Sequence, residues 1–142
     1  LRAALADGTL DALVSDHTPV EADAKALPFA EAEPGATGLE LLWSLALKWA
    51  QDDGVPLPRA LERLTAGPAR VLGKSLTTLQ GSVGQLAVGG LADLVLLSDA
   101  GHWAVSDERL RSQGKSTPFS GYELPGRVLA TLVGGHIAYE AG

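Results

Sequence analysis

The sequence predicts an α/β protein with a helical first half and a β-rich second half. Three observations predict this class: a short apolar run at 12–15, a helix over 38–53 that is apolar except for a narrow polar stripe and its last turn, and glycine-punctuated apolar runs after residue 75. A short continuous apolar run suits a parallel strand that is covered on both faces. A helix as apolar as 38–53 must be nearly surrounded by protein.

The stretch 11–20, DALVSDHTPV, is the feature around which the chain is organised. Its residues 12–15 predict a buried strand, and Pro19 ends any further pairing because it has no N–H. The strand would deliver Asp16 at its C-terminal end, where α/β barrels place catalytic groups. An aspartate after a strand is also common as a turn former or helix cap. These residues alone leave both interpretations open.

The segments that flank this stretch are a helix and a long loop. Residues 1–7 predict the last turns of a helix that Gly8 closes. Residues 18–37 predict a loop rich in Pro, Glu and Ala, with a turn at Pro34–Gly35. Loops of about twenty residues are uncommon in compact domains and are usually functional lids or binding loops.

The helix predicted over 38–53 has its own start signal. Thr37 and Glu40 have the spacing of a capping box, in which two side chains satisfy the first free N–H groups. We expect Trp43 and Trp49 to be core or interface residues rather than part of a cofactor site. The helix is followed by two shorter predicted ones.

Those two helices, predicted over 58–66 and 68–72, include a sequence that superficially resembles a phosphate loop. The segment 67–75, GPARVLGKS, has five residues between its glycines, where the phosphate-binding motif needs four. Nucleotide binding through this segment is therefore rejected.

The second half has the character of a sheet. Residues 94–97, 127–133 and 136–139 predict strands, and Gly134–Gly135 between the last two predicts a two-residue hairpin turn. The change from helical to β-rich sequence predicts a domain boundary near residue 74.

Composition excludes several classes of function. The net charge of −6 argues against a nucleic-acid or anionic-membrane surface, and no apolar run is long enough to span a membrane. Without cysteine the chain has no disulfide, thiolate ligand or cysteine nucleophile, which fits a cytoplasmic location. The chain has no methionine, even at position 1, so we expect it to be part of a larger protein.

Five blocks of sequence, in this order and spanning nearly the whole chain, resemble the dihydroorotases of the amidohydrolase superfamily. They are SDHTP at 15–19, EPGATGLELL at 33–42, TAGPARVLG at 65–73, GSVGQLAVGGLADLVLL at 81–97 and KSTPFSGYELPGRVLATLVGGHIAYE at 115–140. Each block is a weak signal alone, and together they are a strong one.

The resemblance implies the C-terminal third of a metal-dependent (β/α)8 barrel with the C-terminal part of its small β-sandwich. Residues 1–74 would supply the last barrel strand and trailing helices, and residues 75–142 the sandwich part. A whole barrel takes about 250 residues, so 142 cannot hold one. The lone strand would then have unpaired edges, and we expect it to pair with another copy, to be disordered or to refold.

The implied reaction is the reversible ring closure of carbamoyl-aspartate to dihydroorotate in pyrimidine biosynthesis. Asp16 matches the residue that binds the metal, usually zinc, and acts as general base. Pro34 and Gly35 match a loop that contacts the substrate through its backbone.

Two departures from the family pattern affect the expected activity. Val20 stands where active members have a histidine that helps to bind a substrate carboxylate. The resemblance implies that the other metal ligands belong to earlier strands, upstream of this chain. The three histidines that the chain does contain, at positions 17, 102 and 136, have no ligand spacing. We therefore expect no zinc on this chain alone and no turnover by it.

Alternatives to a dihydroorotase remain. A dihydroorotase-like chain that has lost catalytic residues could serve as a structural partner of aspartate transcarbamoylase. Another cyclic amidohydrolase, such as an allantoinase or a hydantoinase, would share the barrel, although the TPFSG and PGATGLE blocks fit hydantoinases less well. We expect the complete protein to be a homo-oligomer that acts on a small-molecule substrate.

Overall fold

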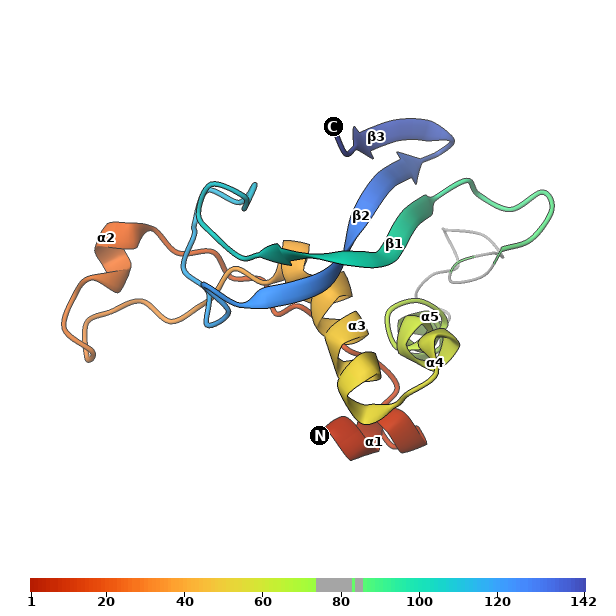
Figure 1. Ribbon diagram of the computed structural model, residues 1–142, viewed down its shortest axis with the longest axis horizontal. Helices are drawn as coiled ribbons and strands as arrows, with labels where there is room; N and C mark the ends of the chain where they lie inside the picture. The colour runs from red at the N-terminus through yellow and green to blue at the C-terminus, as the bar shows by residue number, and fades with distance from the viewer. Residues whose placement is uncertain (74–82, 84–85) are drawn as a thin grey trace.

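The computed structural model describes residues 1–73, 83 and 86–142 (Figure 1). The elements are α1 (Arg2–Asp7), α2 (Ala22–Lys25), the 3-10 turn η1 (Leu39–Leu41), α3 (Leu42–Asp53), α4 (Leu57–Glu62), α5 (Ala66–Leu72), β1 (Leu94–Ala104), β2 (Glu123–Val133) and β3 (His136–Glu140). Helices precede strands, as the sequence predicts. The expected boundary near residue 74 lies at the edge of residues outside the described ranges and stays a prediction.

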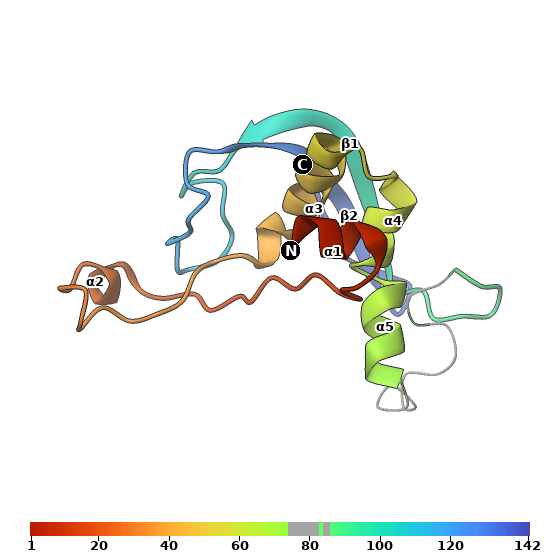
Figure 2. The ribbon, with the colours of Figure 1, turned by 90° about the horizontal axis from the view of Figure 1, so that it is seen from below.

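Three helices gather around one apolar cluster. Leu5 of α1, Trp49 and Ala50 of α3, and Ala60 of α4 are all buried and in contact. Figure 2 shows α1 lying beside α3 and α4. The ends of α1 and α3 are set by glycines in the left-handed conformation, Gly8 with φ 95° and Gly54 with φ 63°. The predicted helix ends are thus confirmed. No helix among the described residues is long and apolar enough to cross a membrane.

The strands form one antiparallel sheet in the order β1-β2-β3. Gly134–Gly135 joins β2 to β3, with φ 56° and 81°, so the predicted hairpin is confirmed. Helix α3 packs against β2 in both views (Figures 1 and 2). A second apolar cluster fills the space between η1 and the sheet; its buried members are Leu41, Val105, Leu110 and Leu124.

Polar contacts fasten α3 to the sheet. The Ser44 hydroxyl donates to the carbonyl oxygen of Gly126 at 3.2 Å and accepts the indole N–H of Trp103 at 3.1 Å. The indole N–H of Trp43 donates to the carbonyl oxygen of Ser98 at 3.2 Å. Trp43 is only 7% exposed, as is Trp49, which confirms the predicted core role of both tryptophans.

The structure corrects two predictions about local structure. Residues 12–15 form no strand, and Val14 is 71% exposed. No neighbouring parallel strand is present within the described ranges to accept the hydrogen bonds that a buried strand would need. The capping box is also wrong, because the N-terminus of η1 has no cap from the Thr37 hydroxyl.

The far end of the sheet carries exposed apolar side chains. Val95 on β1 is 54% exposed, Val133 on β2 is 57% exposed, and Ile137 on β3 is 63% exposed. Apolar side chains on neighbouring strands normally pack under another layer of structure. The described part of the chain places no helix over this end (Figure 1).

Candidate functional site

The stretch 11–20 is irregular, but it is held closely by backbone from elsewhere in the chain. At four points a glycine lies so near that an added Cβ atom would collide with the stretch. The pairs are Gly67 with Asp11, Gly38 with Ser15, Gly35 with Thr18, and Gly114 with Val20. Glycine permits such close backbone approach because it has no side chain. The position of the stretch is therefore determined by contacts along its whole length.

Asp16 lies in this stretch with an unusual backbone conformation. Its φ is 44°, and it is the one non-glycine residue in the described ranges with positive φ. Aspartate tolerates this left-handed region better than most residues, yet the conformation persists only where its surroundings enforce it. The residue is exposed, so its carboxylate is free to meet a ligand from solvent.

The loop that contains Pro34 and Gly35 lies directly against the residues after Asp16. The N–H of Thr18 donates to the carbonyl oxygen of Ala36 at 3.0 Å. Gly35 has φ 130°, and a Cβ there would lie 2.5 Å from the carbonyl oxygen of Thr18. The structure thus places the Pro34–Gly35 loop against Thr18, two residues after Asp16, and Pro34 itself is exposed.

His17 ties the same stretch to the start of η1. Its Nδ1 accepts the N–H groups of Gly38 and Leu39, each at 3.2 Å. These are among the N–H groups that a helix start leaves free. The Thr37 hydroxyl instead donates to the carbonyl oxygen of Gly114, which explains why the predicted capping box does not form. Sequence reasoning missed this role of His17, because the partners are 21 and 22 residues away.

Val20 is buried at the end of the stretch, with 6% of its surface exposed. A Cβ on Gly35 would lie 2.9 Å from a Val20 methyl, and one on Gly114 would lie 2.8 Å from the Val20 nitrogen. The side chain fills space between two backbone segments. In this conformation the position does not present a side chain to a ligand beside Asp16.

Metal ligands are few in the described part of the chain. It contains no group of three or more His, Asp or Glu side chains that could hold a metal ion. Catalytic zinc sites need three protein ligands as a rule, so Asp16 with the described residues does not suffice for one. A metal at Asp16 would need ligands from outside these residues.

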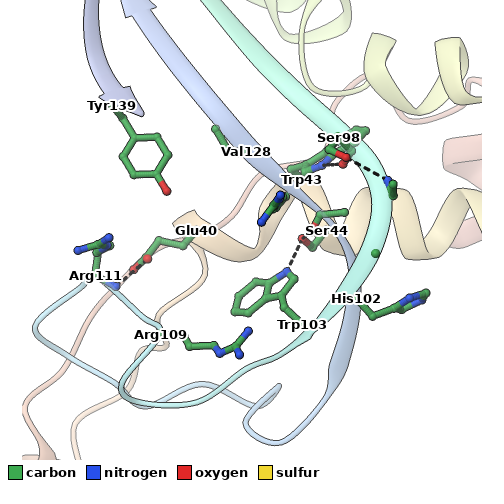
Figure 3. A pocket seen from close by; sticks show the side chains of 14 residues that line it. Glu40, Trp43, Ser44, Ser98, His102, Trp103, Arg109, Arg111, Val128 and Tyr139 are labelled. Carbon is green, nitrogen blue, oxygen red and sulfur yellow. Dashed lines mark hydrogen bonds between the residues drawn. The ribbon is translucent and has the colours of Figure 1, made fainter. Parts of the chain in front are cut away.

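A separate cavity of about 760 Å³ lies between α3, the sheet and the loop after β1 (Figure 3). None of the predicted site residues lines it. One of its lining groups, the Glu40 carboxylate, accepts the N–H groups of Arg111 and Ser112, each at 2.7 Å. Figure 3 shows His102 directed away from Glu40 and Tyr139. Glu40 and His102 therefore do not face one common point of the cavity (Figure 3).

The family model for the amidohydrolase family matches residues 1–138. This match covers nearly all of the chain. The chain belongs to the amidohydrolase family. Among similar proteins of this family, a dihydroorotase-like protein of Pseudomonas aeruginosa is 46% identical over 99% of the chain, and a dihydroorotase of Anaeromyxobacter dehalogenans is 42% identical over 99% of it.

Solved structures of amidohydrolases agree with this assignment. A D-hydantoinase (dihydropyrimidinase) from Thermus sp. superposes with a TM-score of 0.84 at 25% identity, covering 98% of this chain and 30% of the hydantoinase chain. The chain likewise spans only 31% of the length of the two curated relatives. The arrangement of helices and sheet described above is therefore one that hydantoinases share over about a third of their length.

Proposed function

We propose that this chain is the part of a cyclic amidohydrolase that carries its general base, Asp16, and that the substrate is dihydroorotate. The observation that carries the proposal is the convergence of the Asp16 stretch and the Pro34–Gly35 loop, joined by the hydrogen bond from Thr18 to Ala36. The dihydroorotase of A. dehalogenans supports the substrate class, because it is 42% identical over 99% of the chain. The hydantoinase likeness supports the finer architecture, the last third of a (β/α)8 barrel with part of its β-sandwich.

In the proposed reaction, water adds to the amide carbonyl carbon of the ring and the ring C–N bond breaks. The Asp16 carboxylate accepts a proton from the attacking water and passes it to the leaving nitrogen. Carbamoyl-aspartate is formed, and Asp16 returns to its ionised state. Such proton transfer by a positioned carboxylate contributes about 10²–10⁴ in rate. The exposed position of Asp16 allows this contact. Zinc, which the family resemblance implies, would need ligands besides Asp16, because catalytic zinc sites have three protein ligands as a rule.

One observation favours a second candidate, a dihydroorotase-like chain that supports aspartate transcarbamoylase without catalysis. Val20 is buried and cannot donate a hydrogen bond to a substrate carboxylate. Loss of such a bond to a charged group costs about 1.5–3 kcal/mol, or about tenfold to over a hundredfold in affinity. The P. aeruginosa relative, 46% identical, carries the name dihydroorotase-like protein.

A chimera tests the proposal. This chain replaces the matching third of the A. dehalogenans dihydroorotase, and hydrolysis of dihydroorotate, hydantoin and allantoin is measured with zinc supplied, beside Asp16→Asn and Val20→His variants. We expect preference for dihydroorotate and loss of at least about 10²-fold with Asp16→Asn. A folded, zinc-loaded chimera that stays inactive in the Val20→His variant as well would overturn the enzymatic proposal and favour the structural partner. Preference for hydantoin or allantoin would overturn the choice of substrate.

A further inference from the structure

We infer that His17 is a positioning residue that holds Asp16 in its left-handed conformation by accepting two backbone N–H groups at the start of η1. The inference rests on the proposed function only for the chemistry of Asp16. The geometry itself comes from the hydrogen bonds of His17 Nδ1 to Gly38 and Leu39, each at 3.2 Å.

The first step of the argument concerns the protonation of the imidazole. A ring nitrogen that accepts two N–H groups carries no proton, so the neutral ring must have its proton on Nε2. The acceptor pair therefore selects one tautomer of His17. The Nε2–H is left as a donor on the opposite side of the ring from η1.

The second step concerns Asp16, whose neighbours are both fixed to the same segment. On one side Ser15 lies against Gly38, where a Cβ would be 2.6 Å from the Ser15 carbonyl oxygen. On the other side His17 is bound to Gly38, and the N–H of Thr18 is bound to Ala36. Left-handed φ at a non-glycine residue is strained and persists only where the surrounding contacts offset that strain. These bracketing contacts enforce the conformation, and two side chains take part in them. The Thr18 hydroxyl donates to the Asp16 carbonyl oxygen at 3.5 Å, within the stretch itself, whereas His17 is the side chain that links the stretch to residues 38 and 39.

The third step concerns what lies behind η1. Helix α3 follows η1 without a break and is fastened to β2 through the Ser44 hydroxyl and the Gly126 carbonyl at 3.2 Å. His17 therefore connects the Asp16 backbone to the helix–sheet unit. This ties the backbone at Asp16, from which the carboxylate projects, to the rest of the described chain.

A matched pair of variants separates this role from simple packing. In His17→Asn the amide oxygen occupies the place of Nδ1, whereas in His17→Gln the polar atoms lie at the place of Nε2. As a control, His136→Gln makes the same substitution at an exposed histidine on β3, away from the site. All are made in the 142-residue chain, and folding is checked by the amide spectrum of the sheet residues.

Nuclear magnetic resonance supplies three readouts: the ¹⁵N shifts that identify the His17 tautomer, the amide exchange of Gly38 and Leu39, and the one-bond Cα–Hα coupling that reports the sign of φ at Asp16. In the unsubstituted chain we expect an unprotonated Nδ1 and positive φ. His17→Gln should speed amide exchange about tenfold and abolish the positive-φ coupling, while His17→Asn should preserve both. His136→Gln should change neither.

A proton on Nδ1 in the unsubstituted chain would overturn the inference without recourse to any variant. So would retention of slow exchange and positive φ in a folded His17→Gln chain. These readouts do not depend on catalysis. If they come out as expected while the chimera is inactive, the positioning role stands and the assigned chemistry of Asp16 fails.

Discussion

Replacement of Gly35 by alanine tests the contact that unites the candidate site. The substitution has two separable costs. Gly35 has φ 130°, a conformation that L side chains rarely adopt, and its Cβ would lie 2.5 Å from the Thr18 carbonyl oxygen. The oxygen belongs to the backbone, so it cannot turn aside as a flexible side chain would. Either the loop or the Asp16 stretch must shift.

Two other glycines measure these costs one at a time. Gly54→Ala introduces strain alone, because its φ is 63° and nothing lies within 4 Å of the added Cβ; we expect a loss of about 1–2 kcal/mol in the free energy of unfolding. Gly38→Ala introduces collision alone, since φ is −141° and the Cβ would lie 2.6 Å from the Ser15 carbonyl oxygen. Overpacking of this kind costs about 1–3 kcal/mol. Gly35→Ala combines both, so about 2–5 kcal/mol is expected.

The assay is urea unfolding of the 142-residue chain followed by tryptophan fluorescence, since Trp43 and Trp49 are buried. The urea concentration at the midpoint of unfolding should be highest for the unsubstituted chain, lower for Gly54→Ala and lowest for Gly35→Ala. The slope of the unfolding free energy against urea concentration should not change. If Gly35→Ala unfolds at the same urea concentration as Gly54→Ala, the loop does not lie against Thr18. The convergence on which the proposed function depends would then be refuted.

Two further predictions concern the helices that support the site. Arg63 is 2% exposed and donates from Nε to a carbonyl oxygen of α1 at 2.9 Å. Arg63→Ala should therefore lower the free energy of unfolding by at least about 1.5 kcal/mol. The same substitution at the exposed Arg59 should change it by no more than about 0.5 kcal/mol, and urea unfolding of both variants measures the difference. The hydrogen bond from Arg70 lowers the pKa of Glu62 below its ordinary 4.5. The stability that the charged Glu62 gains from Arg70 is fully present above pH 4.5 and is lost as the pH falls through the lowered pKa. Without Arg70 there is less of this stability to lose. The thermal unfolding temperature of Arg70→Ala should therefore fall less between about pH 6 and pH 3 than that of the unsubstituted chain.

The elements that sequence predicted well are those whose signals are local. Helix α3 has its apolar pattern and its closing Gly54 within one segment, and the β2–β3 hairpin has its turn residues at Gly134–Gly135. By contrast, an apolar run such as 12–15 becomes a strand only if another strand accepts its hydrogen bonds. In the described chain the N–H of Leu13 donates to the carbonyl oxygen of Arg63 instead. Whether residues 12–15 form a strand therefore depends on which group accepts their hydrogen bonds, and the local sequence does not indicate that group.

In the candidate site, too, some features could be predicted from the sequence, and others depend on partners far along the chain. The resemblance predicts Asp16 and the Pro34–Gly35 loop as functional, and this role stays a prediction. The structure places the loop against Thr18, two residues after Asp16. The roles of His17 and Thr37 were not predictable, because each depends on a distant acceptor or donor. The Thr37 hydroxyl bonds to Gly114, which is 77 residues away, and leaves the N–H groups of η1 to His17. A lone histidine beside an aspartate carries no sequence signal for helix capping.

The burial of Val20 gives the missing family histidine a structural consequence beyond a lost hydrogen bond. The valine is 6% exposed and fits between the backbones of Gly35 and Gly114. A histidine in its place could not stay in that space without separating the two segments, because the glycines already lie at the limit of close approach. It would instead turn outward, where its ring nitrogens can reach a ligand, and leave the space beside Gly35 and Gly114 unfilled. A gain of substrate affinity in the Val20→His chimera would therefore be accompanied by a loss of packing between these two segments, and the two effects share one cause.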